Sequence, residues 1–199
     1  VEVSSYHFNY FSNHLESIRN SIQHFTFCET NSTKFCKFLV SCPNVKSLSF
    51  QQFIVFDEII DNLELPKPEW NLDNLMVDLS KGSFFRQLFS NLQKSKIKKF
   101  TLKCANDMNL DEIKNFLWHH QELKELDLSD CKHRSKDGKK LFDDDTLSHV
   151  KFRLKSLAIS SNNSESFRNF LALHKDTLEH FEMRKIGNET AKLLNKFTK

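Results

Sequence analysis

Glycine and proline are scarce, with three of each among the 199 residues. Gly-rich phosphate-binding loops and flexible linkers need these residues in number, so the composition excludes both features. Long apolar runs are also missing, since no stretch approaches the roughly 18 apolar residues that a membrane-spanning helix needs. We therefore expect one globular domain without a membrane segment.

An excess of one charge sign is absent as well. The chain has 29 basic and 26 acidic residues, interspersed, with a net charge of +3. A nucleic-acid-binding domain normally carries a strong basic excess, so we expect a protein partner. One alternative remains, a nucleic-acid binder that uses Lys96, Lys98, Lys99 and Lys103 and whose binding would depend steeply on salt.

Sequence signatures of metal sites and of catalysis are missing. The five cysteines are odd in number and form no C-x-x-C, which favours reduced thiols and an intracellular location, in the cytoplasm or nucleus. Cys36 and Cys42 with His24 match no zinc spacing. There is no G-x-S-x-G, P-loop, H-E-x-x-H or dinucleotide Gly pattern, so we predict no cofactor, no metal and no enzymatic activity.

The sequence contains a repeat, best seen in residues 123–131, which read LKELDLSDC. Leu126 and Leu128 alternate with polar residues, the period of a short strand with one buried side, and Leu123 lies three residues earlier. The form apolar-x-x-apolar-x-apolar occurs seven times, at first positions 23, 27, 25, 26, 31 and 24 residues apart. The first positions are Ile22, Val45, Leu72, Ile97, Leu123, Leu154 and Leu178. This is the pattern and approximate period of leucine-rich repeats.

The segments between these strands carry apolar residues at helical spacing. Examples are Ile113, Phe116 and Leu117, and Phe167, Phe170 and Leu171. The other sets are Phe35, Phe38 and Leu39; Phe56, Ile59 and Ile60; and Phe84, Phe85, Leu88, Phe89 and Leu92. We predict an α/β fold, a right-handed leucine-rich-repeat solenoid of about seven strand-helix repeats with a parallel sheet on the concave face. The predicted domains are an N-terminal helical cap, 1–21, and a repeat domain, 22–199. The 20 Phe residues are interpreted as plain core packing.

Two longer segments interrupt the repeats and could hold a binding site. The first, 57–71, contains Pro66, Pro68 and Trp70, and Trp70 either covers the edge of the core or is an exposed anchor for a partner. The second, 132–151, begins basic and continues acidic and then amphipathic. It is either a solvated loop with balanced charges or a functional loop.

The residues that alternate with the buried strand positions should project from the concave face. Seven strands about 4.8 Å apart would make a face on the order of 30 Å wide. The predicted protein-binding residues on this face are Asn74, Met76, Asp78, Lys99, Thr101, Lys103, Glu125, Asp127, Ser129, His180, Glu182 and Arg184. Two lysines of the fourth repeat lie beside two carboxylates of the fifth, and these charges either neutralise each other or select a complementary partner.

The unit F-x-x-F-L-x-x-H/C followed by such a strand occurs in FCKFLVSCPNVKSLSF, IKNFLWHHQELKELDL and FRNFLALHKDTLEHFEM. It resembles the leucine-rich-repeat region of F-box proteins, especially the divergent, Phe-rich ones of insects. The resemblance covers the chain from about Ile22 to its end, and no F-box is visible in it. It implies substrate recognition for a cullin ubiquitin ligase, with a Skp-type adaptor bound only through an F-box preceding Val1. A secreted insect effector acting inside host cells is a related expectation. The alternative is a stand-alone scaffold or inhibitor that acts by occupancy.

Overall fold

The computed structural model describes residues 2–4, 17–28, 38, 41–53, 70–79, 89–90, 92–104, 109–130, 141–142, 145–162 and 164–195. No helix among these residues is long and apolar enough to cross a membrane.

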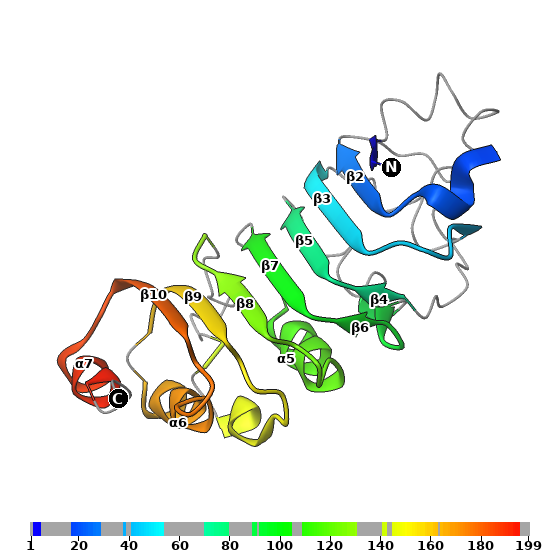
Figure 1. The fold of residues 1–199 in the computed structure, drawn as a ribbon. Helices are drawn as coiled ribbons and strands as arrows, with labels where there is room; N and C mark the ends of the chain where they lie inside the picture. Colours follow the sequence, from blue (N-terminus) through cyan, green and yellow to red (C-terminus); the bar gives the residue numbers. More distant parts are fainter. Residues whose placement is uncertain are drawn as a thin grey trace.

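One parallel sheet dominates the described part of the chain (Figure 1). Its strands follow one another in chain order, and every neighbouring pair is parallel. The strands are β1 (Glu2–Ser4), β2 (His24–Cys28), β3 (Ser47–Phe53), β5 (Asn74–Leu79), β7 (Lys99–Cys104), β8 (Glu125–Leu128), β9 (Ser156–Ser161) and β10 (His180–Lys185). A two-stranded sheet pairs β4 (Asn71–Leu72) with β6 (Lys96–Ile97). The predicted α/β class with a parallel sheet is confirmed.

The seven predicted strand segments align position for position. The second apolar residue of each repeat pairs with that of the next, in the order Phe25, Leu48, Leu75, Phe100, Leu126, Leu157 and Phe181. Six of these side chains are buried, and Phe181 is half-buried. Apolar residues therefore lie beside apolar residues on every rung, as strands with one buried side require.

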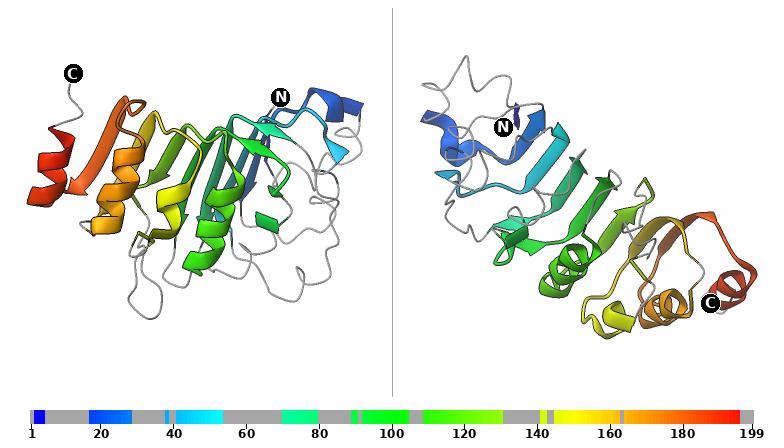
Figure 2. Two further views of the ribbon diagram at one scale, coloured as in Figure 1. Left: turned by 90° about the horizontal axis from the view of Figure 1, so that it is seen from below. Right: turned by 180° about the vertical axis from the view of Figure 1, so that it is seen from behind.

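Three helices and one short 3-10 helix lie on one side of the main sheet (Figures 1 and 2). They are α5 (Leu110–His119), α6 (Glu165–Leu173), α7 (Asn188–Leu194) and η2 (Asp145–His149). A further 3-10 helix, η1 (Arg19–Ser21), precedes β2. The side chain of Asn109 caps α5 by accepting from the Asp111 N–H at 3.0 Å, and Ser164 caps α6 by accepting from the Phe167 N–H at 3.1 Å.

The predicted inward-facing residues of α5 and α6 are buried, which confirms their helical spacing: Ile113, Phe116, Leu117, Phe167, Phe170 and Leu171. In the earlier links Phe38, Phe89 and Leu92 are buried too. The remaining predicted helix residues before α5 lie outside the described residues.

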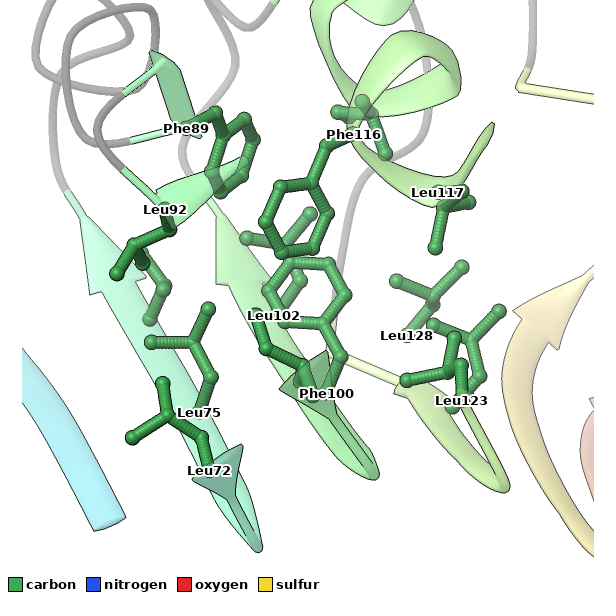
Figure 3. Close-up of a cluster of buried hydrophobic side chains, with 14 of the residues drawn as sticks. Leu72, Leu75, Phe89, Leu92, Phe100, Leu102, Phe116, Leu117, Leu123 and Leu128 are labelled. Atoms are coloured by element: carbon green, nitrogen blue, oxygen red, sulfur yellow. The ribbon is translucent and has the colours of Figure 1, made fainter. Parts of the chain in front are cut away.

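Phenylalanine fills the space between sheet and helices. The Phe116 ring stacks on Phe89 with centroids 4.1 Å apart and lies 4.7 Å from Phe100 (Figure 3). Farther along, Phe142 lies 5.1 Å from Phe167 and 4.9 Å from Phe170. Rings from a strand and from the neighbouring links meet in one layer, which confirms core packing for these described Phe residues.

A second ladder of hydrogen bonds joins the repeats just before the strands begin. Just before β7, β8 and β9, the Lys98 carbonyl accepts from Lys124 N–H at 2.8 Å, and the Lys124 carbonyl accepts from Lys155 N–H at 2.7 Å. Gln23, Lys46 and Lys155 carbonyls accept in the same way from the repeat that follows each. The first of the two residues between the first and second apolar positions thus occupies an equivalent place in these repeats.

Trp70 covers the core, the first of its two interpretations. Its ring is 6% exposed, and its Nε1–H donates to the Cys42 carbonyl at 3.0 Å. The exposed-anchor interpretation does not describe this side chain, because the indole N–H satisfies a buried carbonyl of the neighbouring repeat. Residues 57–69 lie outside the described residues.

The segment 132–151 contributes to the core at its C-terminal half. Leu141, Phe142, Leu147 and Val150 are buried, and η2 packs near α6. Residues 132–140 lie outside the described residues, so the solvated-loop interpretation remains a prediction there.

Both ends of the described chain add to the stack. β1 pairs with β2, so the sheet begins within the segment for which we predicted a helical cap. Residues 5–16 lie outside the described residues, and the cap stays a prediction. At the other end, α7 follows β10.

Two buried histidines occupy the same place in the fourth and sixth repeats, at the C-terminal ends of α5 and α6. His120 is 2% exposed and lies 4.1 Å from the Phe116 ring, and His174 stacks on Phe152 at 5.7 Å. His174 Nδ1 accepts from Leu154 N–H at 3.3 Å, which places its proton on Nε2. Within the described part of the chain, neither nitrogen of His120 has a partner in good hydrogen-bond geometry.

Burial lowers the pKa of both histidines to about 4. For His120 the nearby Ser95 backbone opposes this shift, and for His174 the positive charge of Arg153 adds to it. Both rings are therefore neutral in the folded protein near pH 7.

We expect stability to fall as the pH decreases from 7 to 5. The unfolded chain binds a proton at each histidine near pH 6.5, whereas the folded chain binds it only near pH 4, so acid favours unfolding. The loss should be on the order of 2 kcal/mol for each histidine over this interval. Urea unfolding across the interval measures it. His120→Gln and His174→Gln should each flatten the dependence, and an unchanged slope in the double variant would contradict the assignment.

Candidate protein-binding face

The polar face of the main sheet is formed by side chains that alternate with the buried ones. α5 and α6 cover the other side of the sheet (Figure 2). Of the twelve predicted residues, Lys99, His180, Glu182 and Arg184 are exposed and seven more are partly exposed. These seven are Asn74, Met76, Asp78, Lys103, Glu125, Asp127 and Ser129.

Thr101 is the exception, because it is only 8% exposed. In register it lies between Met76 of β5 and Asp127 of β8. Both neighbours have longer side chains than threonine. The residue therefore offers little surface to a partner, and the predicted face is interrupted at its centre.

The central charges divide into two kinds. Lys99 Nζ lies 3.0 Å from Glu125 Oε2, and these residues face each other in the β7–β8 register. The interpretation that the charges neutralise each other is therefore confirmed for this pair. Asp127 instead accepts from Ser129 N–H at 3.0 Å and from the Ser129 hydroxyl at 2.8 Å. Its carboxylate holds the turn that follows β8.

Lys103 is the basic side chain at the centre that stays unpaired. Its register neighbour is Asp78 of β5, and among the described residues no carboxylate lies within 4.0 Å of its ammonium. Lys103 is partly exposed, so its charge can reach a ligand above the sheet.

Smaller contacts tie the rest of the face together. Asn74 Nδ2 donates to Ser47 Oγ at 3.4 Å, and Gln51 Nε2 donates to Ser49 Oγ at 3.2 Å. At the other end Arg184 of β10 forms an ion pair with Asp130, which follows β8, so the contact crosses β9. Sequence reasoning missed this pair, because the strand period places Arg184 on the face without indicating how far its side chain reaches.

Groups that could hold a metal are absent from the described residues, in which no three His, Cys, Asp or Glu side chains gather. Cys42 is a free thiol whose Sγ donates to the Phe38 carbonyl at 3.4 Å inside the core. What the face offers chemically is hydrogen bonding and charge contacts from many small groups.

Comparison with protein-family models, curated proteins and solved structures gave no match.

The Lys99–Glu125 pair should couple weakly in a double-mutant cycle. Each side chain is about half exposed, so solvent screens the pair and the expected coupling is about 0.2–1 kcal/mol. Urea unfolding of Lys99→Ala, Glu125→Ala and the double variant at low salt measures it. The coupling should shrink in high salt. A larger, salt-independent value would show that the two side chains organise more of the sheet than their mutual contact.

Proposed function

We propose that the chain is a noncatalytic protein–protein interaction module, a right-handed leucine-rich-repeat solenoid whose concave surface is the polar face. The observation that carries this proposal is the register of the sheet, in which the apolar positions of seven repeats pair in order. Such a stack buries the apolar side of each unit only against its neighbours. It also repeats each polar position at a spacing of about 4.8 Å.

Partner binding fits the character of this face. Its groups are numerous, small and spread over several strands, and Lys99 is neutralised by Glu125. An extended surface of this kind suits a protein partner whose contacts are also distributed. Specificity would come from the few charges left unpaired, Lys103 among them.

The resemblance to F-box proteins supports a particular setting. In that setting the repeats recognise substrates of a cullin ubiquitin ligase, and a Skp-type adaptor binds only an F-box on the N-terminal side of the repeats. A secreted effector with similar repeats, acting inside a host cell, would use the same face. The alternative is a scaffold or inhibitor that acts by occupancy alone.

Adaptor binding separates the ubiquitin-ligase setting from the occupancy alternative. We expect a purified Skp-type adaptor to be pulled down by a form of the protein that carries an F-box before the repeats, and not by residues 1–199. Failure of such a form to bind adaptor, with partner binding by the repeats retained, would favour the occupancy alternative.

A three-residue change on the polar face tests the binding site itself. Lys99→Ala, Glu125→Ala and Lys103→Ala together remove the central ion pair and the unpaired lysine, and they leave Asp127 to hold its turn. Partners captured by the parent chain and quantified by mass spectrometry should fall about tenfold or more.

The matched control removes a comparable ion pair on the helix side. Glu189 and Lys192 of α7 lie 2.7 Å apart, and Lys175 is an exposed lysine after α6. Changing these three to Ala removes the same charges from a different surface. Equal capture by the two variants would contradict the assignment of the polar face.

A further inference from the structure

Positive charge is concentrated where the chain approaches the strands. We define the approach edge as residues 20–23, 41–46, 70–73, 92–98, 119–124, 150–155 and 174–179, which lead into β2, β3, β5, β7, β8, β9 and β10. These segments contain nine basic and four acidic residues. Their net charge of +5 exceeds the +3 of the whole chain. The rest of the protein is therefore slightly acidic.

Four lysines occupy equivalent places on this edge, Lys46 and the three consecutive ones Lys98, Lys124 and Lys155. Lys98, Lys124 and Lys155 are the residues whose backbone groups form the ladder before β7, β8 and β9, with N···O distances of 2.8 and 2.7 Å. They come from the three neighbouring repeats that contain β7, β8 and β9, so they form one row across the edge. We call them the lysine row.

Carboxylates close the row at both ends. Lys98 Nζ lies 2.7 Å from Asp73 Oδ1, and Lys155 Nζ lies 2.7 Å from Glu179 Oε1. Both acids occupy the same ladder position in the outer repeats. The neighbouring lysine lowers the pKa of each acid, which is therefore ionised near neutral pH.

The middle lysine is left without a carboxylate. Among the described residues no acid lies within 4.0 Å of Lys124 Nζ, and the nearby Glu122 pairs with Lys96 at 2.9 Å. Like charges on neighbouring strands repel. Lys124 lies between two lysines that are each paired with a carboxylate, so its own positive charge is the one in the row that an anionic ligand would compensate.

We propose that the lysine row binds a short acidic segment of a protein partner, through an interaction surface separate from the polar face. The row spans three strands, or about 10 Å. An extended segment with acidic residues on one side presents carboxylates about 7 Å apart, so two or three of them match this length.

Length also distinguishes a peptide from a nucleic acid. A nucleic-acid strand carries a phosphate charge at every nucleotide, and it would continue past both ends of the row. There it would meet Asp73 and Glu179, which repel it. A short acidic segment centred on Lys124 meets these carboxylates only at its two ends. This proposal does not rest on the proposed function, because the three lysines precede the strands that form the polar face.

Fluorescence anisotropy of a labelled hexaglutamate peptide tests the proposal on the whole chain at low salt. Changing Lys98, Lys124 and Lys155 together to Gln should weaken binding about tenfold or more, because charge complementarity carries the contact. The matched control changes Lys46, Lys151 and Lys175 to Gln, which removes the same charge from other places on the approach edge. The control should lose about threefold or less.

Several outcomes would overturn it. Equal losses in the two variants would mean general attraction of an anion to a basic edge, and undetectable binding by the parent would mean that no such surface exists. A labelled oligothymidylate that binds the parent more tightly than the peptide does, and is lost with the row, would assign the surface to nucleic acid.

Thermal unfolding gives an independent readout that needs no ligand. Lys124→Gln relieves the repulsion in the row and should raise Tm by about 1–3 °C at low salt, with the gain vanishing in high salt. Lys175→Gln should leave Tm nearly unchanged. A lower Tm for Lys124→Gln at low salt would show that the lysine is not repelled, and the argument for an anionic ligand would fail.

Discussion

The register of the parallel strands is the constraint on which the rest of the structure depends. Each strand is short and apolar on one side, and it cannot bury that side alone. Pairing of Leu75 with Phe100 and of Phe100 with Leu126 places apolar side chains on consecutive rungs. A slip of one residue would turn these side chains to the opposite face and expose them. The backbone ladder before the strands, such as Lys124 N–H to Lys98 carbonyl, holds the same register from a second place.

Aromatic packing follows from this register. Since Phe89 belongs to the third repeat and Phe100 and Phe116 belong to the fourth, the three rings meet only when these two repeats are aligned (Figure 3). The buried histidines belong to the same layer, in which His174 lies against both Phe152 and Phe170. A neutral imidazole packs there like another flat ring, and a protonated one would place an unpaired charge in the core. The layer that stabilises the stack at neutral pH is thus also its weak point in acid.

The strands could be predicted because a single period of two marks them in every repeat, and α5 and α6 because Phe and Leu recur at helical spacing. β1 could not, since Glu2–Ser4 show too little of the repeat pattern and depend on pairing with β2. For the candidate face, periodicity identified which side chains project but not how each is used. Lys99 and Glu125 pair while Asp127 turns to Ser129, and that choice depends on strand length: β8 ends at Leu128, so the turn begins beside Asp127. Trp70 was ambiguous because its partner, the Cys42 carbonyl, is distant in sequence.

Because the repeats are aligned, residues at one position of each repeat form a row across the sheet. Two adjacent rows differ in charge: one pairs opposite charges, and the other places lysines side by side. On the polar face Lys99 faces Glu125 across β7 and β8, and the charges cancel. One residue earlier, Lys98 and Lys124 occupy the same two repeats and do not cancel. The distance between neighbouring repeats cannot explain the difference, because it is the same for both rows. The difference therefore lies in which amino acids occupy the two positions. Glu122 shows that an acid is accommodated in this part of the edge, where it pairs with Lys96 and leaves Lys124 uncompensated. One acidic substitution nearby could compensate the charge of Lys124. An uncompensated lysine is expected where the negative charge comes from another molecule.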